Sequence, residues 1–467
     1  MEKAGIGTPP PIIAAKSVVQ TGGVTKMEKN FTLPAPVAGC CSALRQAGYQ
    51  AFPVGGCVRD LLLGRAPEDW DVTTSASPEE ILACFPRAVL TGGAFGTVTV
   101  PTQAGPIEVT PFRTETGYSD GRHPDGVVFV STLEEDLARR DFTVNAMALD
   151  EAGRVVDPFG GQADLARKLI RCVGDPDRRF SEDALRLLRA LRFAAVRSMG
   201  IEEHTAAALH GCRSLLSRVA AERIYAELTR LICGSDAGEV LRCYADVLAV
   251  PIPELAPLVG FDQRNPHHCH DAWGHTAAVV AAAPPEPVLR WAALFHDLGK
   301  PGCFTLDPEG VGHFYGHAPK SAELAAAVMD RLRFDNATRA EVLFLVAHHD
   351  DRLQPTERSV KRAIQDFGVR RLRLLMALFR ADALGHSPDP ARRRLEVCAA
   401  LEALTDRLAG AGDRFTVRDL AVRGEDLLAL GYRGPALGAA LDALVEAVVF
   451  DGLENKKEAL LDFLAGR

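Results

Sequence analysis

Hydrophobic and polar positions follow two different rhythms along this chain. Between residues 34 and 175, short apolar runs alternate with turns and with one short amphipathic segment at 78–85. Short runs rich in Val, Thr and Phe predict β-strands, and the amphipathic segment predicts a helix between them. The predicted strands span 49–56, 70–74, 96–100 and 107–112. We therefore expect a small α/β domain in this part of the chain.

The rhythm changes after residue 175 to long amphipathic helices, of which 181–196 is the first. Almost no strand-like pattern returns, so the remainder is expected to be helical and to form several modules. Pro, Gly and Asn cluster at 251–268 and at 385–394, which predicts breaks there. The expected divisions are an extension (1–33), an α/β head (34–175), a helical neck (176–250), a helical domain (251–385) and a helical tail (386–467).

Composition narrows the class of protein. A chain of 467 residues exceeds one ordinary core, and its 47% hydrophobic content is enough for several. Its first 26 residues are unpatterned, and we expect them to be disordered or to precede a second start at Met27. The eleven cysteines show no CxxC pair and no signal segment is visible, which favours a reducing, cytoplasmic compartment. No apolar run is long enough to span a membrane, and oligomeric state is not specified.

The segment 54–75 holds the first chemical pattern. Gly55 and Gly56 follow an apolar run and precede a helix-like stretch, so backbone amides there could meet a triphosphate, with Arg59 in the first turn. Asp69 and Asp71 lie one residue apart in a β-like stretch, and alternation would place both carboxylates on one face. Such a pair suits Mg²⁺ that carries substrate phosphates. Taken singly, a glycine pair is usually a turn and two such aspartates are usually a solvated face.

The ordered combination resembles a known family. The run "GGCVRD", then "EDWDVTTS", "IEVTPFR", "RRDFTVNAMALD" (139–150), "DPFGGQADL" (157–165) and "RFSEDALRLLRALRF" (179–193) follows the motif order of bacterial class II CCA-adding enzymes and their poly(A) polymerase relatives. The resemblance covers about 34–235. It implies a polymerase β-like α/β nucleotidyltransferase head, followed by a mainly α-helical neck, a further domain and a tail.

The resemblance also implies roles for head residues. Gly56 and Arg59 would bind the phosphates of the incoming nucleotide, and Asp69 and Asp71 would hold Mg²⁺. Glu108 is either a third carboxylate of the site or a strand residue that faces solvent. The nucleotide-binding set is completed by Gly55, and by Arg140 and Asp141 near the ribose, with Asn145 as their supporting turn residue.

Four charged residues follow at three-residue spacing: Asp183, Arg186, Arg189 and Arg192. On one helix they would share a slowly drifting face, which by itself is most often solvated surface. The resemblance assigns Asp183 and Arg186 to the edge of the incoming base, because an acceptor and a planar donor can imitate a pairing partner. The basic residues of the neck would contact the tRNA acceptor end through its phosphates.

A second pattern of histidines and aspartates lies further along the chain. The segment "FHDLGK" resembles the HD phosphohydrolase superfamily, whose metals activate water to cleave phosphoesters. The resemblance implies metal ligands at His275, His296, Asp297 and Asp382, with His317 and His348 as further ligands. A mixed nitrogen and oxygen set suits Mn²⁺, Fe²⁺, Ni²⁺ or Mg²⁺. The expected activity is 2′,3′-cyclic phosphodiesterase or phosphatase action on damaged tRNA ends.

Several functions share this chemistry. The first is addition of CTP twice and then ATP to the tRNA 3′ end, with release of pyrophosphate. An A-adding enzyme or a poly(A) polymerase is the alternative, while the full-length glycine-rich loop at 113–137 disfavours an enzyme that adds only CC. A head that only binds RNA, with the HD domain as the enzyme, is disfavoured by the intact Asp69 and Asp71 pair. The tail would reach the tRNA elbow or simply pack as helices.

Overall fold

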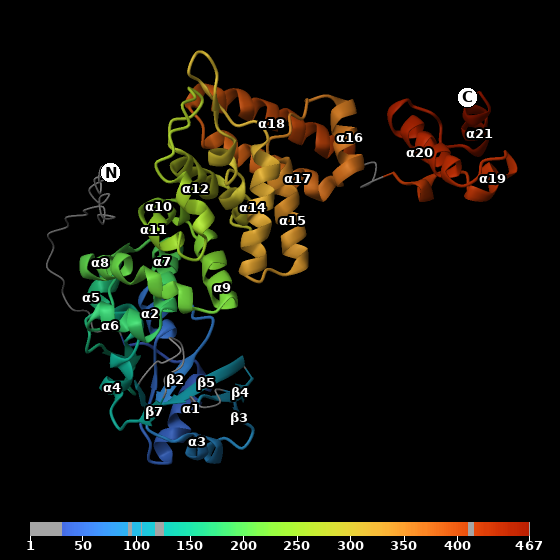
Figure 1. Cartoon of the computed structure of the whole chain (residues 1–467). Helices are drawn as coiled ribbons and strands as arrows, with labels where there is room; N and C mark the ends of the chain where they lie inside the picture. Colours follow the sequence, from blue (N-terminus) through green and yellow to red (C-terminus); the bar gives the residue numbers. More distant parts are fainter. Residues whose placement is uncertain (1–29, 92–95, 104, 117–125, 410–414, 467) are drawn as a thin grey trace. The chain divides into compact units, whose positions relative to one another are not determined.

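The computed structural model describes residues 30–91, 96–103, 105–116, 126–409 and 415–466. Residues 1–29 of the predicted extension (1–33) and the centre of the predicted glycine-rich loop, 117–125, lie outside these residues. The chain divides into two compact units, which are described separately (Figure 1): Met1–Ala256 with Arg331–Arg333, and Pro257–Asp330 with Phe334–Arg467. Among the helices that the structure describes, none is long and apolar enough to cross a membrane.

A five-stranded mixed sheet organises the first unit, in the order β1-β2-β5-β4-β3. Its strands are β1 (Ala51–Pro53), β2 (Asp71–Thr74), β3 (Val89–Leu90), β4 (Val98–Thr102) and β5 (Gly105–Pro111). The central pair, β2 and β5, is parallel, and the other pairs are antiparallel. All four strands predicted from the apolar runs are present, which confirms the α/β class of the head.

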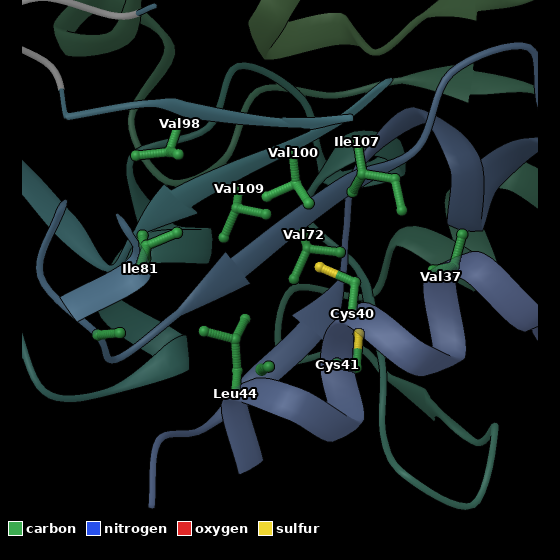
Figure 2. Packing of buried hydrophobic residues seen from close by; sticks show 12 residues of the cluster. Val37, Cys40, Cys41, Leu44, Val72, Ile81, Val98, Val100, Ile107 and Val109 are labelled. Carbon is green, nitrogen blue, oxygen red and sulfur yellow. The ribbon is translucent and has the colours of Figure 1, made fainter. Parts of the chain in front are cut away.

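One face of this sheet is covered by α1 (Ala35–Gln46) and α3 (Pro78–Cys84). Figure 2 shows the α1 side chains, among them Cys40 and Leu44, packed toward Val72 of β2 and Val109 of β5. Because side chains alternate along a strand, the neighbours of these valines point to the opposite face. The polar residues of β2 and β5 are thereby collected on that face.

The head continues with short elements that lead into the neck. They are α2 (Gly56–Leu62), β6 (Arg113–Thr116), β7 (Gly126–Phe129), α4 (Leu133–Ala138), a 3₁₀ turn η2 (Thr143–Asn145), β8 (Ala148–Leu149), β9 (Val155–Val156), α5 (Gly161–Ala166) and β10 (Leu169–Ile170). The neck comprises α6 (Pro176–Glu182), α7 (Leu185–Arg197), β11 (Gly200–Ile201), α8 (Glu203–Cys212), α9 (Ala221–Ile232), α10 (Ala237–Cys243) and α11 (Ala245–Leu248). The strongly amphipathic α9 packs along α7, as expected for helices that share an apolar seam.

The second unit is almost entirely helical. Its helices are α12 (Ala272–Ala282), α13 (Pro287–Phe295), α14 (His317–Arg331), α15 (Asn336–His348), α16 (Glu357–Phe367), α17 (Val369–Leu384), α18 (Pro388–Ala409), α19 (Gly424–Ala429), α20 (Pro435–Phe450) and α21 (Lys457–Ala465). The only strands in its described part, β12 (Thr305–Leu306) and β13 (Gly312–His313), form a hairpin.

The segment 385–394, where a break is predicted, contains a tight turn and the start of α18, which packs along α17. The Gly and Pro residues there reverse the chain between two helices in contact, which composition alone does not distinguish from a linker. A separate apolar cluster forms beyond it, from Leu420 to Leu464, and includes α19, α20 and α21.

Candidate functional site

Three carboxylates gather at the end of the central strand pair. Asp71 is the first residue of β2, and Glu108 of β5 lies directly opposite it in the parallel register. Asp69 is exposed and stands in a bend before the strand, so the predicted alternation does not include it. The reason is that the ladder begins at Trp70, whose carbonyl accepts from the Glu108 amide at 3.3 Å. Asp69 and Asp71 therefore come together through a bend and a strand.

Their proximity is visible in the pKa of Asp71. Burial raises this pKa most, the Arg140 guanidinium lowers it, and the Glu108 and Asp69 carboxylates raise it further, with a net upward shift. Glu108 is exposed, and its carboxylate lies close enough to Asp71 to raise the pKa of that residue. Carboxylates that repel one another at a strand end provide the hard oxygen ligands that Mg²⁺ prefers.

Gly55 makes room for this site. Its φ of +83° is one that residues with a side chain rarely adopt. A Cβ atom at this position would lie 3.0 Å from Arg140 Nη1 and 3.9 Å from Asp71 Oδ2. Backbone, guanidinium and carboxylate therefore converge where only glycine fits, at the start of α2, which also contains Gly56.

Arg59 lies inside the protein, only 6% exposed. Its Nη1 donates to Asn145 Oδ1 at 2.6 Å, and its Nε donates to Asp60 at 3.1 Å. Asn145 in turn donates to Asp141 Oδ1 at 3.0 Å, and Asp141 Oδ2 accepts from Arg189 Nη2 at 2.6 Å. The predicted phosphate and ribose residues thus form one hydrogen-bonded chain from α2 to α7.

Arg140 is held by a residue that the sequence analysis did not select. Asp136 is completely buried and accepts from Arg139 Nη2 at 2.8 Å and from Arg140 Nη2 at 3.2 Å. Burial alone would raise the pKa of Asp136, but the two arginines lower it more, and the net shift is downward. A signal was available, because Asp136 precedes these arginines by three and four residues, the spacing of neighbours on a helix.

The four charged residues of the neck are arranged differently from the predicted single helix. Asp183 lies in a break between α6 and α7, where its Oδ1 accepts from the Leu185 amide at 3.0 Å. Its Oδ2 accepts from Arg223 Nη2 of α9 at 3.0 Å. An aspartate that bonds a nearby backbone amide favours a helix start, which explains why the helix is interrupted at Asp183 although the apolar spacing continues through it.

The arginines of α7 point into the protein and are ion-paired. Arg186 donates to Glu182 at 2.8 Å and to the Arg139 carbonyl at 3.0 Å. Arg192 lies 2.8 Å from Glu227 of α9, and burial lowers its pKa to about 10. The ordinary interpretation of such a face, solvated surface, does not apply to these side chains.

This network leads to a stability prediction. Arg189→Met should lower the free energy of unfolding by about 2–3 kcal/mol. This is somewhat less than the loss expected when a fully buried ion pair is broken, because the Arg189 side chain is 32% exposed. Asp141 would lose its strongest partner while remaining buried. The measurement is urea unfolding, with Arg242→Met as the control, because Arg242 is 61% exposed and its partner Glu239 is 43% exposed. Equal losses in both variants would contradict the prediction.

The same pair predicts a pH dependence. Burial would raise the pKa of Asp141, but Arg189 and Asn145 lower it to about 2. A depressed carboxyl pKa adds stability above the unfolded value of about 3.9, and that contribution disappears as the pH falls toward 2. The difference in the free energy of unfolding between the wild type and Arg189→Met, measured by urea unfolding, should therefore become smaller as the pH falls below 4.

The second unit brings five of the six predicted metal ligands together. His275 Nε2 lies 3.0 Å from Asp382 Oδ1, and His296 Nε2 lies 3.1 Å from Asp297 Oδ2. The other oxygen, Asp297 Oδ1, lies 3.5 Å from His317 Nε2. Asp297 thus belongs to two ligand groups, one on each of its oxygens.

The sixth predicted ligand, His348, does not join these groups. Its Nδ1 donates to Asp351 Oδ2 at 2.7 Å, while His349 Nε2 lies 3.0 Å from His317 Nε2 and 3.7 Å from Asp297 Oδ1. Adjacent residues at a helix end point about 100° apart, so only one of two neighbouring histidines can face the cluster. His386 was also not predicted, and it forms a further group with His275 and Asp382.

The histidines present unshared electron pairs to the centre of the cluster. The Nδ1 atoms of His296, His317 and His349 lie 2.8, 2.8 and 2.7 Å from backbone carbonyls. A ring nitrogen facing a carbonyl carries the proton, which leaves Nε2 as a ligand, the usual outer arrangement of a metal-binding histidine. These donors therefore fit divalent metal ions.

Charges in the cluster are compensated by close neighbours. Burial would raise the pKa of Asp297, but His296 and Lys300 hold it well below the usual range. Burial would likewise raise the pKa of Asp382, but His275 and His386 hold it well below the usual range. The carboxylates are thus ionised, as metal ligands must be.

Four family models match the chain. They are "Poly A polymerase head domain" at 51–171, "Probable RNA and SrmB- binding site of polymerase A" at 198–257, "HD domain" at 275–387 and "tRNA nucleotidyltransferase domain 2 putative" at 396–464. The matches follow the order of head, neck, HD domain and tail.

Known relatives cover nearly the whole chain. A CCA-adding enzyme of Geobacillus kaustophilus is 35% identical over 92% of this chain and 96% of its own. The crystal structure of the Bacillus stearothermophilus CCA-adding enzyme in complex with CTP is 32% identical, covers 93% of this chain and 99% of its own, and has a TM-score of 0.70. The Thermotoga maritima CCA-adding enzyme complexed with tRNA, at 18% identity and a TM-score of 0.56 over 92% and 94% of the two chains, shares the fold. With both sites and these relatives in agreement, the chain belongs to the family of CCA-adding enzymes, the tRNA nucleotidyltransferases.

Proposed function

We propose that the head adds CTP, CTP and ATP to the 3′ end of tRNA, with Asp69 and Asp71 holding Mg²⁺ and Glu108 as the neighbouring carboxylate. The observation that carries this proposal is the register of β2 and β5, which sets Asp71 opposite Glu108 beside Asp69. Bound Mg²⁺ would supply a Lewis acid for the attacking hydroxyl and the triphosphate.

The residues around these carboxylates position the reactants. The terminal 3′-oxygen of the tRNA forms a bond to the α-phosphorus, the bond to pyrophosphate breaks, and the hydroxyl proton is released. Arg140, oriented by buried Asp136, stands beside Gly55 and Asp71 and is placed to bind the triphosphate or ribose. The backbone at Gly55 and Gly56 allows close approach of the phosphates.

Base choice is proposed to reside in Asp183 and Arg186, at the start of α7. Support comes from the break between α6 and α7, where the Leu185 amide and Arg223 fix the Asp183 carboxylate, and from the hold on Arg186 by Glu182 and the Arg139 carbonyl. A planar donor and acceptor fixed in this way can bond the pairing edge of C or A. Arg189 and Arg192 are paired with Asp141 and Glu227, so we assign them to holding α7 in place.

The experiment is nucleotide incorporation into a tRNA transcript that lacks CCA, with CTP and ATP given separately and together. We expect two C residues from CTP alone and complete CCA from the mixture. Long A runs from ATP alone would instead support a poly(A) polymerase.

The same relatives and the free state of all eleven cysteines support a reducing compartment, the cytosol, as the place of action.

A second activity is favoured by the HD cluster. We propose that it hydrolyses 2′,3′-cyclic phosphates or phosphomonoesters. Asp297, which belongs to two ligand groups, and the histidines around it would hold divalent metal ions, which would activate water; Mn²⁺, Fe²⁺, Ni²⁺ and Mg²⁺ all fit these nitrogen and oxygen donors. In a cyclic substrate, a water oxygen would bond to phosphorus, one ribose oxygen would leave with a proton, and a phosphomonoester would result. The shared carboxylate is the observation that carries this proposal.

His348 and His349 form a matched pair for testing the cluster. His349→Ala should reduce Mn²⁺-supported hydrolysis of 2′,3′-cAMP by about 100-fold or more, because loss even of an outer partner of a ligand costs ~10–100-fold. His348→Ala should leave hydrolysis nearly unchanged, since its ring bonds Asp351 outside the cluster. Equal effects of the two substitutions would remove His349 from the metal site.

A further inference from the structure

An open cavity of 390 Å³ adjoins the HD cluster, and its lining includes the metal-site residues His349 and Asp382. Its volume lies at the small end of the ~300–1,000 Å³ typical of small-molecule sites. The lining comes from the segment after α15, from α17 and from α18. A molecule in this cavity would therefore be in contact with the cluster.

The α18 side of the cavity is cationic. Arg393 and Arg394 line it, with Arg352 on the loop after α15. Within the part of the chain that the structure describes, Arg352 and Arg393 have no carboxylate partner. Asp350 and Asp351 also line the cavity, and Asp351 is bonded to His348. The unpaired charges facing this space are thus mainly positive.

Arg394 connects the cavity to the cluster. Its Nη1 donates to Asp382 Oδ2 at 2.6 Å, whereas Oδ1 of the same carboxylate faces His275 at 3.0 Å. The carboxylate can therefore serve a metal with one oxygen while the other orients Arg394. An arginine has five N–H donors, so those not used by Asp382 remain for an anion.

The remaining lining is apolar. Phe379 of α17 is half-buried and lines the cavity together with aliphatic side chains. An aromatic face beside a cationic edge suits a nucleobase attached to a phosphorylated ribose, because bases stack on such rings whatever their sequence.

We propose that this cavity is the substrate site of the HD domain, that it takes one terminal nucleoside carrying a 2′- or 3′-phosphoester, and that Arg393 and Arg394 bind the phosphate while Phe379 stacks on the base. The reaction assigned to this site rests on the proposed hydrolase activity. The binding of phosphate in the cavity does not depend on that activity. Arg394 is the residue that sets the phosphate beside the ligands of the cluster.

The test uses the full-length, Mn²⁺-loaded protein and three neighbouring arginines. Arg393→Gln and Arg394→Gln should each raise KM for 2′,3′-cAMP and the inhibition constant of inorganic phosphate by about 10–100-fold, the effect of losing a charge-assisted hydrogen bond. Arg392→Gln is the control, because Arg392 is 68% exposed, pairs with Asp389 and does not line the cavity. Phe379→Leu should raise KM for 2′,3′-cAMP but leave the inhibition constant of phosphate unchanged.

Nucleotide addition by the head should be the same in all four variants, which verifies folding. If the wild type hydrolyses nothing, the hydrolase proposal fails, and the cavity is tested by calorimetry of inorganic phosphate binding to the Mn²⁺-loaded protein. Weaker phosphate binding by Arg393→Gln and Arg394→Gln than by Arg392→Gln would then support the site. Phosphate binding as tight as in the control would overturn it.

Discussion

Asp71→Asn is expected to reduce nucleotide addition by about 10³-fold or more, because the loss of several kcal/mol of metal-mediated transition-state stabilisation raises the barrier by that amount, and each ~1.4 kcal/mol lowers the rate tenfold. Asparagine keeps the shape of the side chain but removes the charge and one ligand oxygen. The remaining carboxylates, Asp69 and Glu108, are both exposed. Asp69 lies in the bend before β2, and Glu108 lies opposite Asp71 on β5. Neither can replace the ligand at the start of β2.

The same substitution is not expected to destabilise the head. The pKa of Asp71 is raised in the folded protein, chiefly by burial and despite Arg140, so its ionised form opposes folding. A raised carboxyl pKa means that stability is lost as the pH rises through the folded value. A neutral Asn at this position should therefore leave the midpoint of thermal unfolding unchanged or slightly higher. Loss of activity without loss of stability is the pattern of a functional residue.

Two measurements separate this from a general defect. Incorporation of CTP and ATP into tRNA lacking CCA gives the activity, and the upward shift of the thermal midpoint on adding Mg²⁺ with CTP reports binding. The shift should be present in the wild type and much smaller in Asp71→Asn. Asp150→Asn is the control, because Asp150 belongs to a surface pair with Arg154. Activity within tenfold of the wild type would exclude Asp71 as a metal ligand.

Sequence pattern alone recovered the framework of the head. The strands and α3 were predictable because their apolar periods are local and because Ser77 and Glu80 form a capping box at the start of α3. The carboxylates were recognisable from their order along the chain. The way in which they come together was harder to predict, since Asp69 lies in a bend before the strand and is not placed by strand alternation. The break at Asp183 was hidden because the apolar spacing continues through it.

Contacts between distant segments explain the remaining differences. The sequence does not specify whether His348 or His349 faces the cluster, because that depends on the rotation of α15 about its axis relative to the neighbouring helices. Asp136 could be noticed by its spacing to Arg139 and Arg140, but its complete burial is a property of the fold. The predicted roles of these residues in binding stay predictions until variants are measured.

The second large effect is expected at Asp297. Its Oδ2 lies 3.1 Å from His296 Nε2 and its Oδ1 lies 3.5 Å from His317 Nε2, so one side chain contributes to both ligand groups. Asp297→Asn removes a charge and a ligand from each. If the weakening of each ligand group lowers hydrolysis of 2′,3′-cAMP by ~10–100-fold, the combined reduction is about 10²–10⁴-fold, greater than the reduction caused by His349→Ala.

Metal stoichiometry distinguishes a shared ligand from an ordinary one. Titration with Mn²⁺ should show two bound ions in the wild type, one strongly bound ion in His349→Ala, and weakened binding of both in Asp297→Asn. Lys300, whose Nζ lies 2.7 Å from Asp297 Oδ2, would keep its charge in a buried place, so folding must be verified by unchanged nucleotide addition and circular dichroism. If a well-folded Asp297→Asn variant still bound one Mn²⁺ with wild-type affinity, Asp297 would serve only one metal. The two ligand groups would then be independent sites, and a carboxylate shared by both groups could not be the basis of the hydrolysis.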